Sequence, residues 1–169
     1  QYLTPMTGCV RQHNGTVDKF IGDALMAFWN APLDVEDHKV HCINCGLEMF
    51  DLLKKLNEEI KDQELPELKI GVGINSGDVV VGNMGSEQRF DYTCLGDAVN
   101  LSSRLEGQTK EYGVGLIAGQ GTVQGIEDKF NFIELDMIAV KGKKEGVRIF
   151  TVLEDGIDVA HHNKFLEFY

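Results

Sequence analysis

The segment over residues 93–106 constrains the fold most, because it passes directly from a strand pattern into a helix pattern. Asn100 and Arg104 lie four residues apart in its helical part. That spacing places both side chains on one face of a helix, where a hydrogen-bonding amide and a permanent cation with five donors point the same way. Such a pair suits a sugar phosphate as its ligand.

A second informative segment lies near the start of the chain. Apolar residues flank Gly22-Asp23, which predicts a hairpin over residues 16–29 with Asp23 presented at its turn. In an arbitrary protein, an Asp in such a turn stabilises the turn by bonding its own backbone more often than it binds a metal.

The remaining pattern alternates helices and strands. Helices are predicted over residues 2–13, 37–61 and 97–112, with Asp97 as the cap of the last one. Residues 68–75 and 79–82 are predicted to pair as a hairpin across Ser76-Gly77-Asp78. Further strands are predicted over residues 89–95, 114–118, 132–140 and 147–153.

Composition limits the classes of partner. A chain of 169 residues with 43% hydrophobic content can bury one core, so a single main domain is expected. A net charge of -11 disfavours nucleic acid and anionic membrane surfaces, and no apolar run is long enough to insert into a bilayer. An anionic substrate must therefore be bound locally, by metal ions and a few placed cations.

Four cysteines, Cys9, Cys42, Cys45 and Cys94, lie in apolar segments of a mid-sized domain, which is typical of reduced core thiols and a cytoplasmic location. His38, Cys42 and Cys45 follow helical spacing and offer a zinc site as an alternative. The competing interpretation is a buried apolar stripe on the same helix with small cysteines beside it.

Several ordered motifs together resemble the class III nucleotide cyclases, the catalytic domains of adenylate and guanylate cyclases. They lie at residues 18–27, 71–77, 82–86, 90–93, 93–106 and 140–143. The resemblance implies an α/β (α+β) domain with a ferredoxin-like βαββαβ palm-type core, in which helices flank a mixed, mainly antiparallel sheet. It also implies a catalytic domain over residues 1–154 that lacks the family's first strand, first helix and first metal-binding Asp. Residues 155–169 are expected to form a tail and the start of a helix.

By the same resemblance, the reaction turns ATP into 3',5'-cyclic AMP and pyrophosphate at the interface of a homodimer. Asp23 is implied as the metal ligand, with two Mg²⁺ or Mn²⁺ ions per site. Asn100 is implied to orient the ribose, Arg104 to neutralise charge on the transferring phosphorus, and Lys141 to contact the triphosphate. An upstream regulatory or sensor domain is expected in the parent protein, which could anchor it to a membrane.

Lys19 and Thr93 occupy the positions at which the family reads the base. Lys19 can donate to adenine N1, and the Thr93 hydroxyl can accept from the exocyclic amine, so the pair fits ATP. Because a hydroxyl also donates, discrimination by Thr93 is expected to be weaker than that of an obligate acceptor. A guanylate cyclase and a noncatalytic nucleotide-binding or dimerisation module are the two alternatives.

Overall fold

A computed structural model describes residues 2–63, 65–86, 88–139 and 146–153 of the chain. Helices and short strands alternate along these residues, as the hydrophobic periodicity predicts. The elements are α1 (Leu3–Gln12), β1 (Thr16–Ile21), β2 (Ala24–Phe28), α2 (His38–Ile60), η1 (Lys61–Gln63), β3 (Val72–Ile74), β4 (Val80–Ser86), β5 (Arg89–Leu95), α3 (Asp97–Tyr112), β6 (Leu116–Gly119), α4 (Gln120–Val123), β7 (Phe132–Ile138) and β8 (Val147–Val152).

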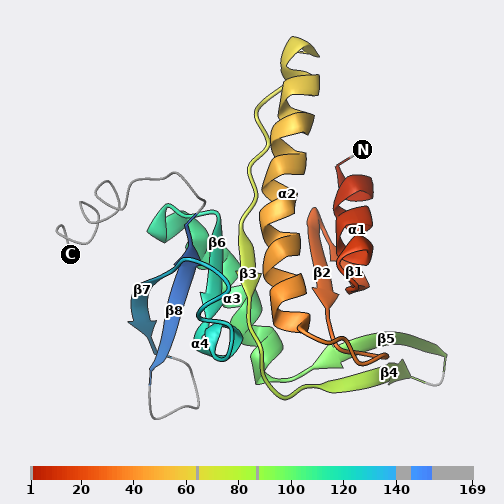
Figure 1. Cartoon of the computed structure of the whole chain (residues 1–169). Helices are drawn as coiled ribbons and strands as arrows, with labels where there is room; N and C mark the ends of the chain where they lie inside the picture. Colours follow the sequence, from red (N-terminus) through yellow and green to blue (C-terminus); the bar gives the residue numbers. More distant parts are fainter. Residues whose placement is uncertain (1, 64, 87, 140–145, 154–169) are drawn as a thin grey trace.

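The strands form one central sheet and two hairpins. The central sheet has the order β3-β6-β8-β7, in which β3 and β6 are parallel and the other neighbours are antiparallel. β1 pairs with β2, and β4 pairs with β5 in a ribbon that projects to one side of the domain (Figure 1). This mixed α+β architecture with mainly antiparallel pairing confirms the expected fold class.

Two helices cover opposite faces of the central sheet, and β6 is buried on both. Leu116 and Ala118 pack with the α2 residue Ile43, whereas Ile117 packs with Leu105 of α3. Alternate residues of a strand face opposite sides, so one short apolar strand serves two cores. In Figure 1, α2 stands between this sheet and the unit formed by α1, β1 and β2.

The predicted hairpin between residues 68–75 and 79–82 is wrong. β3 is parallel to β6, and β4 pairs with β5 along its whole length, from Val80 opposite Leu95 to Ser86 opposite Arg89. The polar residues between them do not close a turn. Asn75 Nδ2 donates to the Ala98 carbonyl at 3.1 Å, which ties the end of β3 to α3 instead of to β4.

The backbone of α3 lies directly against β3, because Gly73 has no side chain. A Cβ at Gly73 would lie 2.3 Å from both Glu106 N and Ser102 O. Ser102 Oγ donates to the Gly73 carbonyl at 2.8 Å and secures the contact. The helix carrying Asn100 and Arg104 is thereby fixed at its closest possible approach to the sheet.

The start of α3 differs from the prediction in one residue. Gly96 occupies the N-cap position with φ of 156°, a conformation that favours glycine, and no side chain caps the helix. Asp97 is the first helical residue, where its charge favours the positive end of the helix dipole. Within the described residues, no helix has the length and apolar character needed to cross a membrane.

Candidate functional site

The turn between β1 and β2 presents Asp23 to solvent. Ile21 pairs with Ala24, so only Gly22 and Asp23 connect the strands, and Gly22 has a φ of 64°. Glycine adopts that angle without steric cost. Asp23 is exposed, and within the part of the chain that the structure describes it forms no ion pair. Its carboxylate oxygens are free to bind a cation.

Lys19 and Thr93 come from elements far apart in the sequence, yet both reach the same carboxylate. Thr93, on β5, is only 6% exposed, and its Oγ1 donates to Asp18 Oδ2 at 2.5 Å. Lys19, on β1, has its Nζ 3.3 Å from Asp18 Oδ1. The two residues predicted to read the base are therefore brought together.

Asp18 is the residue that sequence reasoning missed. Asp18 stands between Val17 and Lys19 and is the one acidic residue of β1. An isolated acid in a strand with apolar neighbours is the sequence signal that could have revealed it. The Asp18 charge also affects Cys94. Burial is the main cause that raises the pKa of the Cys94 thiol, and the charge of Asp18 raises it further. Cys94 is 3% exposed, which agrees with its predicted role as a reduced core residue.

Asn100 and Arg104 are both exposed on α3, one helical turn apart, as the spacing predicts. Arg104 Nη1 donates to the Ala139 carbonyl at 3.4 Å. Ala139 is two residues before Lys141, which itself lies outside the described residues. Among the described residues, neither Asn100 nor Arg104 bonds to Lys19, Asp23 or Thr93. Within one chain, the described site residues therefore lie on three elements: Lys19 and Asp23 on the β1–β2 hairpin, Thr93 on β5, and Asn100 and Arg104 on α3.

The zinc alternative at His38, Cys42 and Cys45 is wrong, because α2 does not bring their ligand atoms together. Within the described residues, the group of potential metal ligands lies elsewhere, at Cys9, His13 and Glu48, whose ligand atoms lie within 4.8 Å of one another.

These ligand atoms already have protein partners. His13 Nε2 is 2.7 Å from Glu48 Oε2, and Cys9 Sγ donates to the Cys45 carbonyl at 3.5 Å. Burial also raises the pKa of Cys9 and of Cys45, which disfavours the thiolate form that binds metals. We therefore assign this cluster to the packing of α1 against α2.

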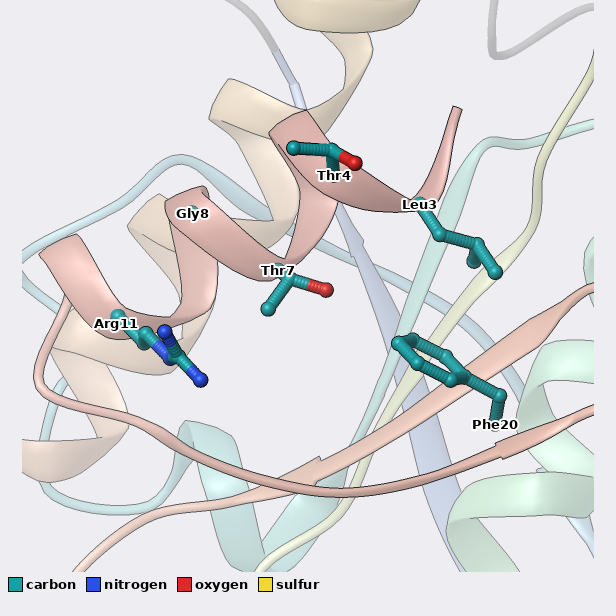
Figure 2. A pocket seen from close by; sticks show the side chains of 6 residues that line it. All are labelled: Leu3, Thr4, Thr7, Gly8, Arg11 and Phe20. Carbon is teal, nitrogen blue, oxygen red and sulfur yellow. The ribbon is translucent and has the colours of Figure 1, made fainter. Parts of the chain in front are cut away.

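A hollow of about 420 Å³ lies beside the hairpin and contains none of the predicted site residues. Figure 2 shows the ring of Phe20 beneath the α1 side chains Leu3 and Thr7, with Arg11 further along the same helix. Phe20 directly follows Lys19 and is 50% exposed. The hollow thus leaves the Phe20 ring, near the end of β1, partly exposed to solvent.

Exposed apolar side chains also lie at the turn end of β1 and on the β4–β5 ribbon. Ile21 is 59% exposed, Val80 67%, Phe90 63% and Leu95 55%. Single exposed apolar residues are normal, but several on adjoining hairpins indicate a surface that another protein covers. The predicted base-reading residues and Asp23 lie on these same hairpins.

Comparison with known proteins gives consistent relatives. A model described as the adenylate and guanylate cyclase catalytic domain matches residues 3–154. Adenylate cyclase 1 of Rhizobium meliloti (strain 1021) is 35% identical over 153 residues, which are 90% of this chain and 23% of that protein. The adenylate cyclase of Anabaena cylindrica is 35% identical over 159 residues, 89% of this chain and 30% of that protein. The chain thus spans less than a third of either relative.

Solved structures agree with these matches. The adenylyl cyclase CyaB from P. aeruginosa superposes with a TM-score of 0.82 at 32% identity, covering 93% of this chain and 81% of that one. The guanylyl cyclase Cya2 superposes with a TM-score of 0.77 at 31% identity, covering 93% of this chain and 80% of that one. Overall similarity is therefore close to cyclases of both substrate classes.

Proposed function

Because this chain belongs to the family of adenylate and guanylate cyclase catalytic domains, we propose that it converts ATP into 3',5'-cyclic AMP and pyrophosphate at a site shared by two copies of the chain. The carrying observation is the convergence of Lys19 and Thr93 on Asp18. Donation from Lys19 to N1 and acceptance by Thr93 from the exocyclic amine match adenine and mismatch guanine. Residue identity thus favours ATP, in agreement with the adenylate cyclases among the sequence relatives, whereas solved structures of both substrate classes superpose on the chain.

Family members generally depend on metal ions, and the donor chemistry of this chain fits that requirement. Asp23 offers an exposed carboxylate, the ligand type that Mg²⁺ and Mn²⁺ prefer, at a turn with no competing cation among the described residues. We expect two ions per site, which would lower the pKa of the ribose 3'-hydroxyl and bind the phosphate oxygens. Asp23 is the ligand that this chain supplies.

The protein's own polar groups bind and orient the nucleotide. Asn100 holds the ribose through its amide, and Arg104 neutralises charge that grows on the α-phosphate during attack by the 3'-hydroxyl. The contact from Arg104 to the Ala139 carbonyl brings the guanidinium beside the segment that leads to Lys141, our candidate for the triphosphate contact. These groups act by position and charge, so the reaction needs no dedicated protein base.

Cyclase catalytic domains act as dimers, and two features of this chain support a homodimer. The predicted residues form separate groups within one chain, and the hairpins that carry Lys19, Asp23 and Thr93 also expose apolar side chains. In a two-fold dimer, Asp23 of one copy would face Lys19, Thr93, Asn100 and Arg104 of the other. The longer relatives also support regulation by other domains, and four free cysteines support a cytoplasmic location.

The test measures cyclic nucleotide production by the full-length protein with ATP and GTP in parallel. We expect cyclic AMP as the main product and a large loss of kcat in Asp23→Asn, because charge is removed with little change in volume. Asp128→Asn, another exposed acid, is the matched control and should retain wild-type kcat. Cyclic GMP as the main product would identify a guanylate cyclase, and nucleotide binding without turnover would identify a noncatalytic module.

Subunit complementation tests the shared site. Asp23→Ala and Arg104→Ala should each abolish both sites of a homodimer, because every site needs both residues. A heterodimer of the two variants joins both lesions in one site and leaves the other intact. Half of the dimers in an equal mixture are mixed, so the mixture should regain about a quarter of wild-type activity. Mixed dimers, shown by cross-linking, that remain inactive would mean that the site lies within one chain.

A further inference from the structure

A carboxylate with no exposed surface lies between the two side chains predicted to read the base. The Asp18 side chain is 0% exposed, and its Oδ2 accepts the hydrogen bond from Thr93 Oγ1 at 2.5 Å. Oδ1 is 3.3 Å from Lys19 Nζ, within ion-pair distance but without hydrogen-bond geometry, and among the described residues it has no other partner. Burial of a carboxylate is unfavourable, so its presence here calls for a reason.

The pairing of β1 with β2 is irregular at Asp18. Val17 pairs with Ala27 and Lys19 pairs with Met26, so Asp18 is an extra residue with no partner on β2. In a regular strand, neighbouring side chains face opposite sides, whereas a bulge redirects them. The irregularity therefore lets Asp18 reach Thr93 while Lys19 stays near the same carboxylate.

The hydrogen bond from Thr93 to Asp18 determines what Thr93 can offer a ligand. A hydroxyl has one proton, and an ionised carboxylate can only accept. With that proton directed at Asp18, the Thr93 oxygen presents only lone pairs to any other group. We propose that Asp18 is a positioning residue that makes Thr93 an obligate hydrogen-bond acceptor and so sets the preference for adenine over guanine; this inference rests on the proposed function.

The two bases differ at the atom that meets Thr93. The adenine amine donates to a lone pair of Thr93 Oγ1, whereas guanine O6 brings a second acceptor against it. Lys19 has three ammonium protons and a side chain 39% exposed, so it retains donors for N1 of adenine. Asp18 thus removes the weakness expected of a threonine, whose hydroxyl would otherwise rotate and donate to O6.

The experiment compares the binding of 3'-deoxy-ATP and 3'-deoxy-GTP to the full-length protein with Mg²⁺, by calorimetry. Neither analogue has the attacking hydroxyl, so the ratio of the two Kd values is measured whether or not the protein turns over. In Asp18→Asn, the new amide can donate to Thr93 Oγ1. The hydroxyl proton of Thr93 can then point toward the base, so the preference for the adenine analogue should fall about tenfold. Asp51→Asn, an exposed acid on α2, should leave the ratio unchanged.

A double-mutant cycle isolates the pathway through Thr93. Thr93→Val removes the hydroxyl at similar volume, and in that background Asp18→Asn should no longer change the ratio. An unchanged ratio in Asp18→Asn alone, or an equal change in the valine background, overturns the inference. If Asp18→Asn does not fold, the smaller neutral Asp18→Ser carries the same expectation.

Failure of the proposed function gives a different pattern. A protein that makes no cyclic nucleotide but shows the tenfold change in the Kd ratio refutes the catalytic proposal and supports the role of Asp18. A wild-type protein that binds neither analogue refutes both.

Discussion

Replacement of Gly73 by alanine tests how closely the sheet positions the helix that carries Asn100 and Arg104. The new Cβ would lie 2.3 Å from Glu106 N and Ser102 O, both backbone atoms that cannot rotate away. Ordinary contacts of this type need more than 3 Å, so α3 must retreat by roughly 1 Å. The Ser102 hydrogen bond to the Gly73 carbonyl is then stretched as well.

The energetic consequence follows from two opposing terms. Overpacking against rigid atoms costs about 1–3 kcal/mol, whereas Gly→Ala stabilises by up to about 1 kcal/mol through the unfolded chain. We expect the first term to exceed the second, with a net loss of about 1–2 kcal/mol. The displacement of Asn100 and Arg104 by roughly 1 Å should also lower kcat/KM by about a hundredfold.

Gly107→Ala is the matched control, because Gly107 lies on the same helix with nothing within 4 Å of its ideal Cβ. It should raise stability by about 1 kcal/mol through helix propensity and leave kcat unchanged. Urea unfolding followed by circular dichroism, together with kcat/KM for both variants, makes the comparison. Wild-type stability and activity in Gly73→Ala would show that this contact does not set the position of α3.

Three further predictions concern other parts of the domain. Changing Lys19 to Glu together with Thr93 to Cys should shift the ratio of kcat/KM values from ATP toward GTP, because a carboxylate accepts from guanine N1 where Lys cannot. An unchanged ratio would mean that other residues read the base. Phe90→Ser should weaken dimerisation, measured by sedimentation, because Phe90 is 63% exposed on the proposed interface; unaltered dimerisation would exclude this surface. Tyr112 donates to Asp136 Oδ2 at 2.7 Å and holds the pKa of that carboxyl below its ordinary value, so Tyr112→Phe should cost about 0.5 kcal/mol at neutral pH after allowance for solvent screening. A lowered folded-state pKa contributes stability above the ordinary value that is lost as pH falls through the folded value, so this cost should shrink in acid; a cost independent of pH from 2 to 7 would contradict the assignment.

Much of the local structure could be predicted because neighbouring residues determine it. The predicted helices over 37–61 and 97–112 correspond to α2 (His38–Ile60) and α3 (Asp97–Tyr112), whose apolar periodicity and flanking turn residues are local signals. The β1–β2 hairpin was likewise predicted from Gly22-Asp23. The roles of Asn100, Arg104 and Asp23 stay predictions, although α3 places Asn100 and Arg104 one helical turn apart and the turn presents Asp23, as expected.

The prediction failed where pairing depends on distant segments. A run such as 71–77 looks like a hairpin arm, but its edge is taken by β6, more than forty residues later. The backbone groups of a strand can pair with those of any other strand, so residues 71–77 do not by themselves specify β6 as their partner. The local turn pattern at Ser76-Gly77-Asp78 indicated a nearer partner. Cys45 also contacts Cys9 of α1 instead of acting with His38 and Cys42 on its own helix.

The order of residues was sufficient to determine the family, the hairpin that presents Asp23, and the helix face shared by Asn100 and Arg104, because each depends on spacing within a few residues. Only the folded chain could decide that Asp18 meets Thr93, because those residues are separated by 75 positions and become neighbours through the packing of β1 against β5. The sequence shows which side chains are present, whereas hydrogen-bond direction depends on which groups packing brings within 3 Å of one another.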